Sequence, residues 1–173
     1  VVRAAERDQR ISAVVLVTPP YDPVAWTEML DPLMARQLLL LADDGRDPET
    51  VIESFSMRAS LDGWHCPALI FGAGEDRVAP PDEADRVAPA IGDWATLVRY
   101  PNAGHGLEQV HEGGKKDRNR VLSTLAANAG HQVRNNPMPK MSWKHGDDGT
   151  KLTIQVTSDP APKAVRLWVA DNP

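Results

Sequence analysis

The sequence predicts an α/β protein, with a mostly parallel sheet, flanking helices and a short antiparallel β appendage. Between Ile11 and Tyr100, short apolar runs alternate with longer helix-forming segments, which is the pattern of βαβ units. Beyond the proline- and asparagine-rich segment 135–139, apolar residues recur at every second position, as in antiparallel strands. We therefore expect an α/β domain over residues 1–134 and a β-rich appendage over 135–173. The strands of the appendage are expected either to pack on the first domain or to begin a longer sandwich-like extension.

Apolar periodicity and capping signals place the elements in order. The β-branched run Ile11–Thr18 is predicted to be a central strand buried on both faces, and later strands are expected at Ala68–Phe71 and Thr96–Tyr100. Helices are expected at about 1–9, 29–42, 47–58, 81–90 and 116–129, the last with Val121, Leu122, Leu125 and Ala126 on one face. The appendage is predicted to hold three antiparallel strands, marked by Met141 and Trp143, by Leu152, Ile154 and Val156, and by Val165, Leu167 and Val169.

Composition excludes several classes of protein. The chain has 173 residues, is 42% hydrophobic and carries a net charge of -5, with 19 scattered basic residues. We therefore expect no nucleic-acid or anionic-lipid surface and no membrane insertion. The single cysteine, Cys66, excludes an intramolecular disulfide and is expected to be a buried side chain.

Two residues suited to proton chemistry follow neighbouring predicted strands. Asp76 lies in the loop Gly72–Arg77, and His105 lies in the loop Pro101–Gly106. Loops at the carboxyl ends of neighbouring parallel strands converge on one crevice, so we expect these side chains to meet there. A carboxylate beside an imidazole is two thirds of a Ser-His-Asp triad, in which the histidine is the base and the acid orients it. Glu75 is a rival acid.

The nucleophile of such a triad is not found in this sequence. In hydrolases with the order acid then histidine, the serine precedes both, on a strand-to-helix turn of pattern Gly-x-Ser-x-Gly. None of the serines present has these flanking glycines; they fall in predicted strands, helices, a linker and the appendage. We expect the nucleophile upstream of Val1 and no hydrolysis by this chain alone.

Other candidate residues have weaker support. Tyr21 and Trp26 follow the first strand in a proline-rich loop and are candidates for lining a substrate pocket, although packing is an equal alternative. The acids at 82, 83 and 85 fit a helix N-terminus better than a metal cluster. His111-Glu112 lacks the spacing of zinc peptidases, and no glycine-rich phosphate loop occurs. We therefore predict neither metal nor cofactor.

Three segments together resemble the PhoPQ-activated pathogenicity-related family. They are Pro67–Arg77, Arg99–Leu107 and the tail from Met141 to Pro173, which ends in Leu-Trp-Val-Ala-Asp-Asn-Pro. The resemblance implies an α/β-hydrolase-like fold with a C-terminal β-rich extension, and it puts Asp76 and His105 on the acid and base positions. The nucleophile region of the family has no counterpart here. Because proteins of this family are commonly bacterial and exported, the resemblance implies a periplasmic or extracellular location.

The resulting hypothesis is the C-terminal part of a serine hydrolase that acts on a small-molecule ester or a peptide. A second hypothesis is a non-catalytic binding or surface protein that keeps the hydrolase scaffold. A dehydrogenase-like nucleotide binder is disfavoured, because the glycine fingerprint is absent. The sequence upstream of Val1 separates the first two hypotheses.

Overall fold

The structure, a computed structural model, describes residues 2–23, 47, 50, 53–54, 56–110 and 116–165. Its contacts divide the chain into two units, Val1–Leu125 and Ala126–Pro173. Each unit is described by itself. The predicted helix at 29–42 and Trp26 lie outside the described residues.

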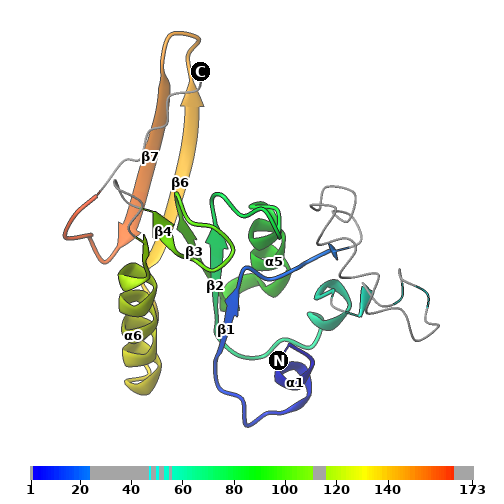
Figure 1. The fold of residues 1–173 in the computed structure, drawn as a ribbon. Coiled ribbons are helices and arrows are strands. Elements are labelled where there is room, and N and C mark those ends of the chain that lie inside the picture. The colour runs from blue at the N-terminus through cyan, green and yellow to red at the C-terminus, as the bar shows by residue number, and fades with distance from the viewer. Residues whose placement is uncertain are drawn as a thin grey trace. The chain divides into compact units, whose positions relative to one another are not determined.

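The first unit is built on a parallel sheet with the strand order β1-β2-β3 (Figure 1). The strands are β1 (Val14–Val17), β2 (Ala68–Ala73) and β3 (Ala95–Tyr100), and helix α5 (Glu83–Ile91) connects the last two. Val14 pairs with Ala68, and Ala68 pairs with Ala95, so the strands begin level with one another. Every residue of β2 is buried, as its apolar sequence requires of a middle strand. The predicted α/β class is confirmed.

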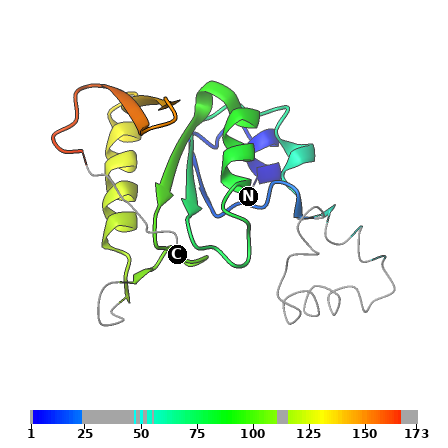
Figure 2. The same ribbon diagram turned by 90° about the horizontal axis from the view of Figure 1, so that it is seen from above.

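Alternate residues of β2 supply two separate parts of the core. Ala68 and Ile70 pack with β1, with helix α1 (Val2–Arg7) and with α5, and Figure 2 shows these two helices on the same side of the sheet. Leu69 and Phe71 face the other way, toward a cluster that includes Tyr100, Ala103, Leu107 and Val121. The rings of Phe71 and Tyr100 meet edge to face, with centroids 5.4 Å apart.

The predicted burial of β1 on both faces is wrong. Val14 and Leu16 are buried, whereas Val15 is 40% exposed and Val17 is 51% exposed. In the described sheet β1 lies at an edge, and α1 and α5 cover only the face with Val14 and Leu16. A β-branched run predicts a strand because it fits the pleated backbone, but it does not determine how many faces are covered.

The helix prediction for 47–58 holds at its start and differs at its end. Asp47 accepts hydrogen bonds from the backbone N–H and the hydroxyl of Thr50, both at 3.0 Å, as an N-cap does. At the other end, Ser56 lies outside any helix, and a short 3-10 helix, η2, spans Arg58–Ser60. A second 3-10 helix, η3 (Gly92–Trp94), links α5 to β3.

The last helix, α6, spans Asn119–Val133, so the predicted start at residue 116 is wrong. Residues Lys116–Asp117 instead form β5, which pairs with β4 (Gln109–Val110). The predicted apolar face is also only half correct: Val121 is buried, but Leu122 is 60% exposed and Ala126 is exposed. Neighbouring helix residues point about 100° apart, so a stripe through Val121 and Leu125 leaves Leu122 outside it.

The second unit contains an antiparallel hairpin of β6 (Lys140–Asp147) and β7 (Leu152–Asp159). The carboxylate of Asp148 accepts the N–H groups of Thr150 and Lys151, both at 2.9 Å, and so closes the turn. Two of the three predicted strands are therefore present. Of the third, Val165 lies outside any strand, and residues 166–173 lie outside the described part. None of the helices among the described residues is long and apolar enough to span a membrane.

Candidate active site

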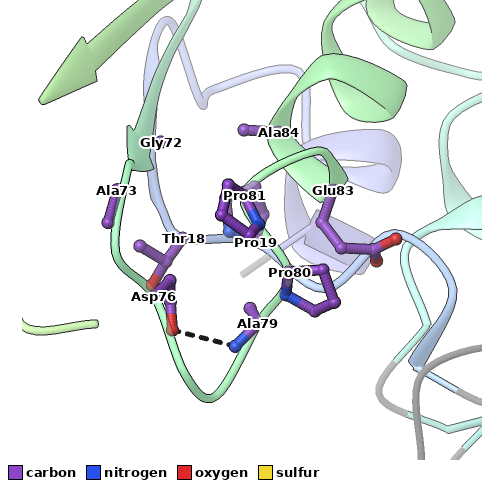
Figure 3. Close-up of a pocket in the computed structure, with 10 residues that line it drawn as sticks. All are labelled: Thr18, Pro19, Gly72, Ala73, Asp76, Ala79, Pro80, Pro81, Glu83 and Ala84. Atoms are coloured by element: carbon purple, nitrogen blue, oxygen red, sulfur yellow. Dashed lines mark hydrogen bonds between the residues drawn. The ribbon is translucent and has the colours of Figure 1, made fainter. Parts of the chain in front are cut away.

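Asp76 lies in the loop that follows β2, and the backbone of this loop is fixed. The N–H of Gly74 donates to the carbonyl of Tyr100 and that of Glu75 to the carbonyl of Ala103, both at 3.0 Å. The side chain of Asp76 is 1% exposed. Its Oδ1 accepts the N–H groups of Val78 at 2.8 Å and Ala79 at 2.9 Å, and Figure 3 draws the bond to Ala79. The carboxylate is therefore held in one orientation.

His105 lies in the turn that follows β3. The N–H of Leu107 donates to the carbonyl of Gly104 at 2.8 Å, and the buried Leu107 holds the turn with a φ of 58°. On the other side of the histidine, Arg118 Nε donates to the carbonyl of Gly106 at 3.0 Å. The His105 side chain is 47% exposed. The turn thus presents the imidazole at the surface while its backbone is anchored.

The two loops bring these side chains together. His105 Nδ1 lies 2.9 Å from Asp76 Oδ2 and 3.2 Å from Asp76 Oδ1. Because an ionised carboxylate only accepts hydrogen bonds, this contact assigns a proton to Nδ1. In the neutral ring the lone pair is then on Nε2, which is the atom that can take up a proton. The carboxylate would stabilise the imidazolium formed in that step.

The other predicted site residues take different places. Glu75 is exposed, so the buried Asp76 is the acid that contacts His105. Tyr21 is half-buried and packs against the core cluster formed by β1, α1 and α5. Trp26 lies outside the described residues.

The acids at the start of α5 bind protein groups. Asp82 pairs with Arg86 at 3.1 Å, and Asp85 pairs with Arg99. Glu83 is buried and accepts the backbone N–H groups of Tyr21 and Asp22. In the described part of the chain, no group of three or more His, Cys, Asp or Glu residues is arranged to hold a metal ion. His111 and Glu112 lie outside that part.

A small cavity lies beside Asp76 and is lined by Thr18, Ala73, Ala79 and Glu83, among others (Figure 3). Its volume is about 10 Å³, which is room for about one water molecule. It is therefore too small to accept an ester or a peptide.

Sequence reasoning did not find three residues that support this site: Thr18, Glu83 and Arg118. Thr18 and Arg118 contact the His105 loop, and Glu83 holds the loop that follows Thr18. These contacts join residues that are 12 to 87 positions apart in the sequence, so local patterns carried no signal for them. Among the described serines, none is hydrogen-bonded to the His105 ring, whose partner in that part of the chain is Asp76.

Comparisons with known proteins agree with the fold. No curated protein matches the chain. Among solved structures, a 2,6-dihydroxy-pseudo-oxynicotine hydrolase is similar with a TM-score of 0.61 and 16% identity, over 79% of this chain and 38% of that one. A monoacylglycerol lipase from Paleococcus ferrophilus is similar with a TM-score of 0.52 and 15% identity, over 78% of this chain and 64% of that one. A puromycin-hydrolyzing peptidase from Mycobacterium tuberculosis has 24% identity and a TM-score of 0.49, over 61% of this chain and 17% of that one.

The chain spans less than two thirds of the length of each of these structures. The first two of these structures are of the α/β-hydrolase type, and their similarity supports the same fold class for this chain. A protein-family model matches a larger share of the chain, residues 28–173. On that match, and in agreement with the motifs around Asp76 and His105, the chain belongs to the PhoPQ-activated pathogenicity-related protein family.

Proposed function

We propose that Asp76 and His105 are the acid and the base of a serine-hydrolase triad in the whole protein. The observation that carries the proposal is the 2.9 Å contact between Asp76 Oδ2 and His105 Nδ1. It joins two loops that follow adjacent parallel strands, as the geometry of an open α/β sheet favours. The hydrolase-like scaffold shared with the solved structures supports this proposal.

The proposed reaction is hydrolysis of an ester or amide bond. A serine hydroxyl supplied upstream of these 173 residues attacks the carbonyl carbon, while His105 Nε2 takes up the hydroxyl proton. Asp76 keeps the other ring nitrogen protonated and stabilises the positive ring. The same Nε2 proton then passes to the leaving group, and water releases the acyl group in a second round. The substrate class we propose is a small-molecule ester or a peptide.

The alternative is a binding protein that keeps the scaffold without catalysis. No serine in the described part of the chain is hydrogen-bonded to His105, so the triad needs a serine from outside that part, whereas the binding protein needs none. In that case the Asp76–His105 pair would remain as a structural feature of the crevice. The chain printed here is expected to be inactive by itself under either hypothesis.

The two hypotheses are separated with the whole protein, including the segment upstream of Val1. We expect it to hydrolyse a nitrophenyl ester and to react with a fluorophosphonate probe. His105→Ala should lower kcat by about 10⁴-fold or more, because an unassisted serine hydroxyl is a weak nucleophile. His145→Ala, which removes an exposed histidine of β6, is the control. A whole protein with no turnover and no labelling would instead be the binding protein.

A further inference from the structure

Thr18 has a strained backbone beside the Asp76–His105 pair. It follows the last residue of β1, and its N–H still donates to the carbonyl of Phe71 at 2.8 Å, which extends the parallel ladder. Yet its φ is 42°, and the residue is 7% exposed. A β-branched residue seldom adopts a positive φ, because Cβ then crowds the backbone. Such strain persists only where surrounding contacts enforce it, and it concentrates at functional sites.

The first set of enforcing contacts comes from Glu83 at the start of α5. Its Oε2 accepts the backbone N–H groups of Tyr21 at 2.7 Å and Asp22 at 2.8 Å. The side chain is 2% exposed, and its Oε1 lies 3.3 Å from an Arg86 nitrogen. Two N–H groups and a guanidinium therefore compensate the buried charge, which makes this a strong, directional anchor.

The second set acts on the carbonyl groups of the same loop. The hydroxyl of Ser56 donates to the carbonyl of Tyr21 at 2.8 Å, and the N–H of Arg58 donates to the same oxygen at 3.3 Å. The N–H of Met57 donates to the carbonyl of Pro20 at 3.2 Å. Two N–H groups and two carbonyl groups of residues 20–22 are therefore bound, which restricts the loop that Thr18 leads into.

The turn directs Thr18 toward the candidate active site. Its side chain lines the small cavity together with Asp76 and Ala79, and Figure 3 shows it next to Asp76. Its hydroxyl donates a long hydrogen bond, 3.5 Å, to the backbone carbonyl of His105. Thr18 thus connects the loop after β1 to the main chain that carries the imidazole.

We propose that Thr18 is a positioning residue for His105, and that the buried Glu83 carboxylate holds Thr18 in the strained conformation this task requires. This inference rests on the proposed function, because His105, which Thr18 orients, is the base of the proposed triad. Fixing the His105 carbonyl restricts rotation of the turn, and therefore the direction in which the ring meets Asp76. A base that is free to swing loses the aligned contact on which proton transfer depends.

The test measures the His105 ring by NMR in the chain printed above, with His105→Ala used to assign its Nδ1–H signal. Thr18→Val keeps the shape and the strain but removes the hydroxyl, whereas Thr18→Ser keeps the hydroxyl. We expect Thr18→Val to speed exchange of the Nδ1 proton with water by about twofold, the factor that corresponds to a hydrogen bond at the weak end of the usual range, because this bond is long. Thr18→Ser should stay near wild type.

Glu83 is tested in the same way. Glu83→Gln removes the charge from the buried anchor and should speed the same exchange, while Asp82→Asn removes a charge from the neighbouring exposed residue and should not. Wild-type exchange rates in both Thr18→Val and Glu83→Gln would overturn the inference. A wild-type chain without a hydrogen-bonded Nδ1 proton on His105 would overturn the proposed function itself.

Discussion

Replacing Asp76 by Asn tests how the carboxylate controls the histidine. In the native chain Oδ1 accepts the N–H groups of Val78 and Ala79, and Oδ2 faces His105 Nδ1. Asn has one acceptor oxygen, and the two N–H groups require it. Its NH₂ group then faces Nδ1, which must become an acceptor. We therefore expect the ring proton to move from Nδ1 to Nε2, where it blocks the basic site.

The effect of Asp76→Asn on stability follows from the same contacts. A hydrogen bond to a charged group contributes about 1.5–3 kcal/mol and a neutral one about 0.5–1.5 kcal/mol, so each bond that loses its charge is weakened by about 1 kcal/mol. Three bonds are affected, and the side chain is 1% exposed, so water cannot replace them. We expect the free energy of unfolding to fall by about 2–4 kcal/mol.

Two measurements check this expectation: urea denaturation and the nitrogen-15 spectrum of the His105 ring, which distinguishes the two tautomers. Asp93→Asn, at an exposed position after α5, is the control and should change stability by less than about 0.5 kcal/mol. The reasoning is refuted if Asp76→Asn matches this control and leaves the proton on Nδ1.

Three further predictions concern neighbouring groups. Glu75→Gln should leave the His105 tautomer unchanged, because Glu75 is exposed and outside the pair; a change in the ring spectrum would contradict this. Burial raises the pKa of the Cys66 thiol, so a disulfide reagent at pH 8 should modify it much more slowly in the folded chain than in urea, and equal rates would contradict burial. Burial also raises the pKa of Tyr100. The folded chain therefore keeps this proton at a pH where the unfolded chain loses it, and stability should fall as the pH rises above about 10. Absorbance titration of a Tyr21→Phe variant isolates Tyr100, and an unshifted phenol would refute the prediction.

The elements around the site could be predicted because their signals are local. An unbroken apolar run marks β2, and glycine-containing loops mark the ends of β2 and β3. Parallel strands carry their following loops to one edge of the sheet, so the meeting of Asp76 and His105 follows from topology. The contact between these two side chains is the part of the candidate site that the sequence predicted in advance.

The sequence predictions are wrong or incomplete where a tertiary contact determines the burial, the partner or the backbone conformation of a residue. The pattern of β1 does not show that Val15 and Val17 are exposed, since coverage depends on which helices pack on the sheet. Glu83 has the position of a helix N-terminal acid, yet its carboxylate binds backbone groups 61 and 62 residues earlier in the chain. Thr18 looks like the end of a strand, and nothing in the local sequence indicates its positive φ of 42°.

Asp76 and Glu83 show how one arrangement serves two purposes. Each carboxylate is buried, and in each one oxygen accepts two consecutive backbone N–H groups. The difference lies in the partner of the carboxylate's other oxygen. Glu83 faces the guanidinium of Arg86, which stays charged at any ordinary pH, so that contact can only hold the loop. Asp76 faces an imidazole that is half exposed and can gain or lose a proton, so the same buried anion is placed to respond to a proton transfer. The role of a buried acid in these loops is therefore better indicated by the side chain that faces its second oxygen than by its burial or its backbone hydrogen bonds.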